Sequence, residues 1–324
     1  MRPDLSVLLL TTLIGAGQGL FVALFSTELV ALAGLVPAQD GHFFYAHGSL
    51  LALVFLAGGL VASFFHLGRP ERAWRAAAMW RTSWLSREVI VLPAVIATVF
   101  LFGVAHLLAA GGAILTRDEG ANATVLLGSL CTVLTFALFV CTAMIYACLP
   151  FLREWASPLT VVNYTLLGLA SGFTLAAAFA SVAAPELVAA MAGTACVLTA
   201  LGLAGRIASL VRNARLAPKS TLQTALGIAQ PRIVQKSMGF MGGSFNTREF
   251  FHGRSASTLR RVQWAFIVAA FVIPLVILGA CWAGAPAAFA RLAFVIQFLG
   301  LVAERWCFFA EAHHPQNLYY QAVA

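Results

Sequence analysis

The sequence predicts an all-α integral membrane protein that folds as an eight-helix transmembrane bundle. Of its 324 residues, 61% are hydrophobic and 10% are charged, and the mean hydropathy is +0.89. A soluble globular domain carries about 25% charged residues. The composition therefore excludes a soluble globular enzyme and predicts that most side chains face lipid or one another.

Eight apolar runs follow one another along the chain, each bounded by charged residues, proline or glycine. Each is at least as long as the roughly 20 residues that a helix needs to cross the hydrocarbon layer. The predicted spans cover residues 5–36, 44–66, 88–111, 123–150, 158–183, 187–211, 262–283 and 287–310. The first run is too long for the apolar segment of a signal peptide, so we interpret it as the first span. We expect residues 1–324 to form a single transmembrane domain, with a long polar loop at 212–261.

Lysine and arginine are distributed very unequally between the two sides of the predicted bundle. With eight spans, both termini lie on the same side as the loops at 67–87, 151–157 and 212–261; we call this side A and the opposite side B. Of the 20 Lys and Arg residues, only Arg117 and Arg291 fall on side B. Positively charged residues near span ends remain in the cytoplasm. We therefore expect a multi-pass protein of the bacterial inner membrane, with both termini cytoplasmic.

The basic side A has two further interpretations, which are attraction to anionic lipid headgroups and docking of an acidic soluble partner. The loop at 212–261 is longer than connection of two spans requires. Its glycine-rich segment at 238–245 lacks the Lys-Ser/Thr pair of a phosphate-binding loop. We interpret this segment as a turn, and we expect no nucleic-acid partner.

Close helix packing and the absence of metal ligands are two further predictions. Gly15 and Gly19 in the first run have the four-residue spacing that lets two helix backbones approach closely in a membrane. The six cysteines lie in apolar runs without metal-ligand spacing, so we predict no metal site. A b-type haem needs two histidines facing each other at one depth, for which His47 and His106 are the candidates. We expect no haem, although the sequence leaves this alternative open.

Ionisable residues within or at the rim of a span are candidates for function, because each is costly in hydrocarbon. They are Glu28, His47, His66, Glu88, His106, Glu304, Arg305 and Glu311. His66 ends the second run and Glu88 opens the third, so both belong at the side A rim, where they can face one pocket. A quinone head needs hydrogen-bond donors for its carbonyls and a group that exchanges protons near neutral pH. His66 and Glu88 can supply this chemistry, so a quinone site with these two residues as its catalytic pair is one interpretation of their position.

The loop between these two residues is rich in arginine and tryptophan. Its aromatic rings provide a wall for a flat quinone ring, and its guanidinium groups hold the rim electrostatically. The predicted quinone-binding set is His66, Arg69, Trp74, Trp84, Arg87 and Glu88. A structural interpretation also exists, because His at a helix C-terminus and Glu at an N-terminus complement the helix dipole. The tryptophans likewise match an aromatic belt at the headgroup level.

A transporter with a binding site at the bundle midplane is the alternative function. Such a protein needs ionisable groups and broken helices at mid-depth. The predicted spans carry few of these features. The sequence therefore favours chemistry at the side A rim over transport.

Several motifs resemble one known family. They are Phe64–Trp74, Ser83–Glu88, Ser237–Phe240, Ser244–Phe251 and Glu311–Tyr320. Together they resemble the dimethyl sulfoxide reductase anchor subunit family (DmsC-type), and the span count fits along the whole chain. The opening at Thr11–Gly19 is more similar to the anchors of cytoplasmic sulfite-oxidising complexes in the same family.

The resemblance implies an eight-helix membrane anchor without haem. Such an anchor binds an iron–sulfur subunit, which contacts a molybdopterin-containing catalytic subunit, and it exchanges electrons with membrane ubiquinone or menaquinone. In the family, the residues matching His66 and Glu88 are associated with quinol binding. Both sulfoxide reduction and sulfite oxidation remain open for the complex, and the first-span resemblance favours sulfite oxidation.

Overall fold

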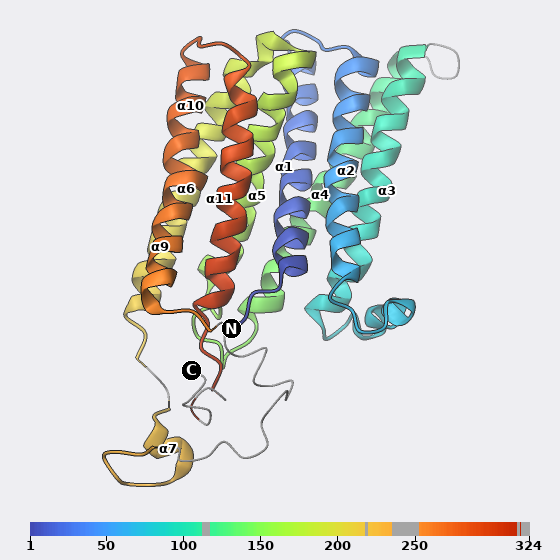
Figure 1. Ribbon diagram of the computed structural model, residues 1–324. Coiled ribbons are helices and arrows are strands. Elements are labelled where there is room, and N and C mark those ends of the chain that lie inside the picture. The colour runs from blue at the N-terminus through green and yellow to red at the C-terminus, as the bar shows by residue number, and fades with distance from the viewer. Residues whose placement is uncertain (112–116, 218–219, 235–252, 316–317, 319–324) are drawn as a thin grey trace.

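Long helices that run side by side make up most of the chain (Figure 1). The computed structural model describes residues 1–111, 117–217, 220–234, 253–315 and 318. Eight helical segments in these residues are long and apolar enough to cross a membrane. They are Leu5–Leu32, Gly41–Phe64, Trp84–Ala110, Gly120–Ala147, Pro158–Ala183, Pro185–Ala214, Ala256–Trp282 and Phe289–Ala310. The predicted all-α, eight-span fold is confirmed.

Some spans combine two or three helical elements. The uninterrupted helices are α1 (Leu5–Leu32), α3 (Trp84–Gly111), α4 (Arg117–Ala147), α5 (Pro158–Ala183) and α11 (Phe289–Ala310). A π-helical turn, η1 (Gly41–Ala46), precedes α2 (His47–Phe64), and a 3-10 turn, η3 (Pro185–Leu187), precedes α6 (Val188–Ala214). The seventh span consists of α9 (Ala256–Ile267), the π-helical η4 (Val268–Val272) and α10 (Ile273–Trp282). In the part of the chain that the structure describes, two short helices lie outside the spans, η2 (Pro70–Met79) and α7 (Leu222–Leu226).

The predicted span boundaries differ from the observed ones at several helix ends, among them the start of the seventh span. The apolar run begins at residue 262, whereas the helix begins at Ala256. Ser255 caps this helix, because its hydroxyl accepts a hydrogen bond from the Thr258 N–H at 3.3 Å. Arg260 and Arg261 then lie exposed in the first turns. A charged first turn is therefore helical although it lies outside the apolar run.

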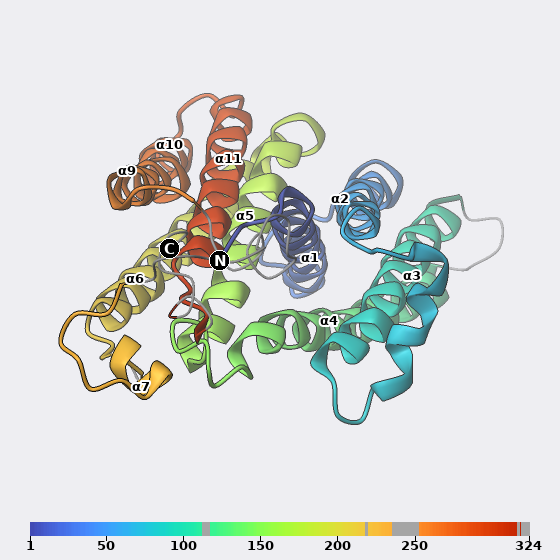
Figure 2. The same ribbon diagram turned by 60° about the horizontal axis from the view of Figure 1, so that its bottom comes forward.

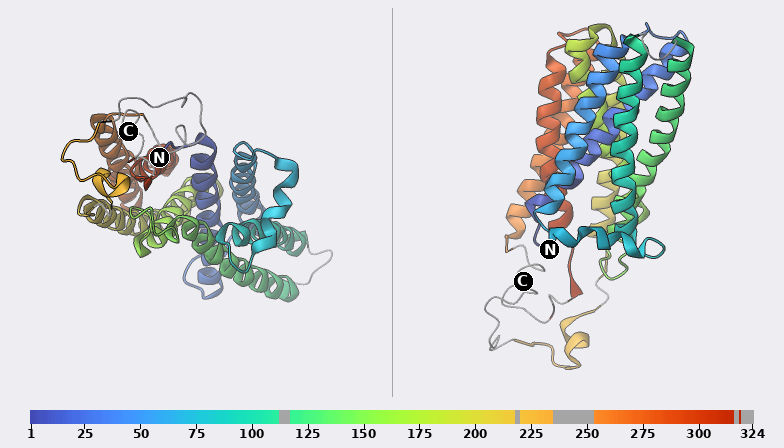
Figure 3. Two further views of the ribbon diagram at one scale, coloured as in Figure 1. Left: turned by 90° about the horizontal axis from the view of Figure 1, so that it is seen from below. Right: turned by 90° about the vertical axis from the view of Figure 1, so that its right-hand side faces the viewer.

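Both ends of the described chain meet at one end of the bundle, as an even number of spans requires (Figure 1). The Met1 amine donates a hydrogen bond to the Ala312 carbonyl at 2.8 Å, just beyond the end of α11. Helix α7 projects from the same end (Figure 3). This end is side A.

Helix α1 lies in the middle of the bundle and packs against α2, α4, α5 and α11 (Figure 2). Gly15 and Gly19 of α1 face Gly168 and Gly172 of α5. A Cβ atom on Gly19 or Gly172 would collide with the backbone of the other helix. The packing role predicted for the Gly15 and Gly19 pair is confirmed.

We predict that Gly172→Ala destabilises the protein, because the added methyl group meets the α1 backbone at Gly19. Overpacking of this kind costs about 1–3 kcal/mol. Gly58→Ala is the matched control, since a Cβ there would lie 3.7 Å from Leu13 Cδ1, an ordinary contact. Thermal unfolding of the detergent-purified protein measures both variants. Equal melting temperatures for the two variants would contradict the glycine contact.

Candidate functional site

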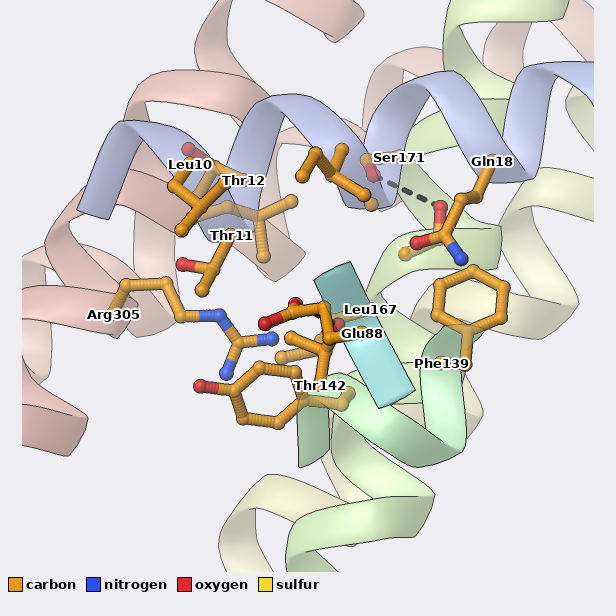
Figure 4. Close-up of a pocket in the computed structure, with 15 residues that line it drawn as sticks. Leu10, Thr11, Thr12, Gln18, Glu88, Phe139, Thr142, Leu167, Ser171 and Arg305 are labelled. Carbon is orange, nitrogen blue, oxygen red and sulfur yellow. Dashed lines mark hydrogen bonds between the residues drawn. The ribbon is translucent and has the colours of Figure 1, made fainter. Parts of the chain in front are cut away.

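A small cavity lies among the spanning helices toward side A, between α1, α3, α4, α5 and α11 (Figure 4). Its volume is about 20 Å³, which is room for about one water molecule. Most of its lining is apolar, but two charged side chains reach it, Glu88 from α3 and Arg305 from α11. A carboxyl and a guanidinium group thus share one buried space inside the spanning region.

Glu88 enters the cavity from the second turn of α3. This helix begins at Trp84, and the Ser83 hydroxyl accepts a hydrogen bond from the Ser86 N–H at 3.3 Å. The Glu88 side chain is 7% exposed. Thr142 of α4 donates a hydrogen bond to Glu88 Oε1 at 2.5 Å. One hydroxyl group therefore meets part of the hydrogen-bonding requirement of a carboxyl group that is costly to bury.

Arg305 is buried on the opposite wall of the cavity. Its guanidinium group stacks on the ring of Tyr164, with the guanidinium carbon 3.7 Å from the ring centroid. Its Nη1 atom lies 3.5 Å from Glu304 Oε2. Figure 4 shows the guanidinium group directed toward Glu88. Stacking on an aromatic face compensates part of the cost of burying this cation.

A network of buried charges continues from Arg305 toward side A. Arg206 of α6 is 2% exposed, and its Nε lies 2.8 Å from Glu304 Oε1. Its Nη2 lies 3.2 Å from Glu311 Oε2. Gln263 of α9 donates a second hydrogen bond to Glu311, to Oε1 at 2.8 Å. The network thus joins α6, α9 and α11 at their side A ends.

Glu304, Arg305 and Glu311 were candidates from the sequence, whereas Arg206 was grouped with the other basic residues of side A. Its position inside the predicted span at 187–211 is the signal that identifies Arg206 as a buried charge. An arginine inside a span needs a buried anionic partner.

His66 lies at the side A rim rather than in the cavity. It is exposed at the end of α2, and its Nδ1 lies 3.2 Å from the Ser6 hydroxyl of α1. That hydroxyl donates a hydrogen bond to Asp4 at 2.8 Å. Burial lowers the pKa of His66, and the nearby Asp4 carboxylate opposes this shift. His66 and the Glu88 cavity therefore adjoin successive turns of α1, at Ser6 and Leu10, without sharing one cavity.

The other members of the predicted quinone-binding set lie around η2, outside the cavity. Arg87 connects the first turn of α3 to the segment between η2 and α3. It donates hydrogen bonds to the carbonyls of Trp80 and Arg81 at 2.9 and 2.8 Å, and it stacks on Trp84. Arg69 is exposed at the start of η2 and Trp74 is 71% exposed. Their role in quinone binding stays a prediction.

His47 and His106 occupy different surroundings near side B. His106 is buried, with Nε2 3.4 Å from Glu28 Oε1 and its ring stacked on Tyr45. Glu28 also accepts a hydrogen bond from Thr124 at 2.5 Å. His47 is exposed, and its Nδ1 lies 2.9 Å from a backbone carbonyl. The expected absence of haem stays a prediction.

Comparison with known proteins identifies the relatives of this chain. A family model described as DMSO reductase anchor subunit (DmsC) matches residues 1–235. A sulfite dehydrogenase subunit from Allochromatium vinosum is 56% identical over 330 residues, covering 100% of both chains. The match confirms the resemblance that the motifs carry. The chain therefore belongs to the DMSO reductase anchor subunit family of membrane proteins.

Proposed function

We propose that this chain anchors an oxidoreductase complex in the bacterial inner membrane and exchanges electrons between membrane quinone and an iron–sulfur subunit. The iron–sulfur subunit in turn contacts a molybdopterin catalytic subunit. Family membership supports the anchoring role. The name of the Allochromatium vinosum relative favours sulfite oxidation, in which electrons flow toward quinone.

The observation that carries the quinone proposal is the burial of Glu88 beside Arg305 at the side A end of the bundle. A carboxyl in a spanning helix is costly and is characteristic of proton-transfer sites. Reduction of a quinone takes up two electrons and two protons. The partner supplies the electrons, whereas the protons require acid–base groups on this chain.

We place the quinone head at the side A rim between α2 and α3, beside the first turns of α1. His66 lies at this rim and Glu88 lies behind it. The cavity next to Glu88 measures about 20 Å³, which fits a water molecule rather than a quinone ring. The ring therefore belongs outside the cavity, with Glu88 at its inner edge.

The hydrogen bonds of Ser6 define how His66 exchanges its proton. An ionised carboxylate only accepts, so the single hydroxyl proton of Ser6 goes to Asp4. Neutral His66 then donates from Nδ1 to the Ser6 oxygen and keeps Nε2 as an acceptor. Protonated His66 donates from Nε2 to a quinone carbonyl, so this nitrogen both gives and takes the proton.

Side A is the surface that we assign to the partner subunits and to the cytoplasm. The positive charge of its loops complements an acidic partner surface. The motifs at 237–240 and 244–251 lie in the long loop, outside the described residues. Anionic lipid headgroups remain a second contact of the same basic side.

The transporter alternative has less support. Among the described residues, the charged network of Arg206, Glu304, Arg305 and Glu311 lies toward side A rather than at mid-depth. The polar Gln297 near η4 is neutral, and it donates hydrogen bonds to Thr199 and to the Ala270 carbonyl. Neither feature forms a charged midplane site.

We predict that His66→Gln and Glu88→Gln each slow quinone-linked turnover of the intact complex. Loss of a general acid or base typically costs about 10²–10⁴-fold in rate. Turnover with a soluble artificial electron acceptor should stay unchanged, because this route bypasses the anchor. Both rates are measured on the same membranes. Full quinone-linked rates in both variants would contradict the catalytic role and would mean that these residues only stabilise helix ends.

We predict that Asp4→Ser moves the pH dependence of quinone reduction to lower pH. Serine retains the N-cap of α1 but removes the carboxylate that raises the pKa of His66. The proton-donating form of His66 is therefore lost at a lower pH than in the unmodified protein. The measurement is kcat/KM for quinone against pH. An unchanged profile would mean that His66 does not donate the proton.

We predict that side B faces the periplasm, which cysteine labelling measures directly. Cys148 is exposed at the side A end of α4, whereas Ala38 is exposed in the side B loop. A membrane-impermeant maleimide should label Ala38→Cys, in a Cys148→Ser background, on intact spheroplasts. The unmodified protein should react at Cys148 only in inverted vesicles. Reversed labelling would place the partners in the periplasm.

A further inference from the structure

The buried charges near side A do not balance when every group is ionised. The set contains two arginines and three carboxyl groups, all between 1% and 8% exposed: Glu88, Arg206, Glu304, Arg305 and Glu311. Fully ionised, it carries one net negative charge in a low-dielectric environment, which is costly. It becomes neutral when one carboxyl group carries a proton.

The partners of each carboxyl group identify the one that carries this proton. Arg206 forms ion pairs with Glu304 at 2.8 Å and with Glu311 at 3.2 Å. Glu88 instead has a neutral hydroxyl, that of Thr142, at 2.5 Å. None of the described cationic side chains forms an ion pair with Glu88. Glu88 is therefore the carboxyl group whose protonated form neutralises the set.

Arg305 is placed between two carboxyl groups and is only loosely bound to one of them. Its 3.5 Å distance to Glu304 is longer than the 2.8 Å distance from Arg206 to the same carboxylate. Tyr164 contacts the face of the guanidinium group, so this stacking leaves its N–H edges available to other partners. One edge faces Glu304, and the group is directed across the water-sized cavity toward Glu88 (Figure 4).

We propose that Arg305 is the counter-charge of Glu88 at the quinone site. Arg305 turns toward Glu88 when this carboxyl group gives up its proton, and returns to Glu304 when Glu88 is protonated again. Glu304 keeps its ion pair with Arg206 throughout, so the movement leaves no carboxylate without a cation. The role of the transferred proton in this proposal rests on the proposed quinone function, whereas the coupling between Arg305 and Glu88 does not.

The proton balance of the step is simple. Glu88 transfers one proton to a quinone oxygen and His66 transfers the other, while two electrons arrive from the iron–sulfur subunit. The products are a quinol, ionised Glu88 and neutral His66. Glu88 and His66 then recover their protons from water on side A. In this scheme Arg305 is a positioning residue that stabilises the ionised form of Glu88.

The test measures the protonation of Glu88 in the intact purified complex by infrared spectroscopy against pH. The band of the protonated carboxyl group is assigned by its loss in Glu88→Gln. In Arg305→Met we expect Glu88 to hold its proton at least tenfold more tightly than in the unmodified complex. Arg305→Lys should recover part of this change, because it retains the positive charge. An unchanged titration in Arg305→Met would overturn the proposal.

The exposed Arg291 on the same helix provides the matched control. Arg291→Met removes an equal charge near side B and should leave the Glu88 titration unchanged. An equal shift in this variant would indicate a general electrostatic effect and contradict a specific pair. Because Arg305→Met leaves the Arg206 and Glu304 ion pair in place, we expect the variant to fold. If Arg305→Met does not fold, the Glu88 titration is measured in Arg305→Lys instead.

Quinone-linked turnover distinguishes this proposal from the proposed function. We expect Arg305→Met to slow turnover at least tenfold, with no further loss when it is combined with Glu88→Gln. Independent, multiplicative losses would contradict the pairing. If Glu88→Gln leaves quinone turnover intact while Arg305→Met still shifts the Glu88 titration, the counter-charge holds and the quinone site is wrong.

Discussion

The close contact between α1 and α5 determines how the rest of the site is arranged. Gly15 and Gly19 of α1 meet Gly168 and Gly172 of α5, so the two backbones approach without intervening side chains. Gly15 and Gly168 also line the cavity beside Glu88. The glycine contact therefore fixes the distance between the wall that α1 supplies and the wall that α5 supplies. It also fixes Tyr164, one turn before Gly168, on which Arg305 stacks.

Burial of charge in a low-dielectric environment explains why the ionisable groups occur as two separate sets. One set surrounds Arg305 and Glu304 toward side A, and the other pairs Glu28 with His106 near side B. Between them, aromatic rings of Phe21, Phe25 and Phe102 pack against one another. This apolar layer separates the side A cavity from side B. In the proposed scheme, Glu88 therefore exchanges its proton with the side on which we place the partner subunits.

The number and order of the helices, and the meeting of both chain ends at one end of the bundle, were predictable from the sequence, whereas the partners of the buried charges were not. Span length and the distribution of Lys and Arg depend on local composition, which a single sequence contains. The pairing of Arg206 with Glu304 and Glu311 depends on how α6 and α11 are rotated about their axes. These helices are apolar on most faces, so no hydrophobic stripe indicates that rotation. For the same reason the sequence allowed His66 and Glu88 to face one pocket, whereas in the structure His66 contacts Ser6 at the rim, outside the Glu88 cavity.

The different environments of His66 and Glu88 suit a reaction that moves two protons. His66 is exposed and bound to Ser6, so it equilibrates readily with water on side A. Glu88 is buried beside a guanidinium group, and in the proposed scheme its ionisation depends on whether Arg305 turns toward it. Two acid–base groups with contrasting surroundings divide the work of one site, as paired titratable residues do in many enzymes. In this scheme the residues of the anchor manage the protons and position the quinone, while the partner subunits carry the electrons and the substrate.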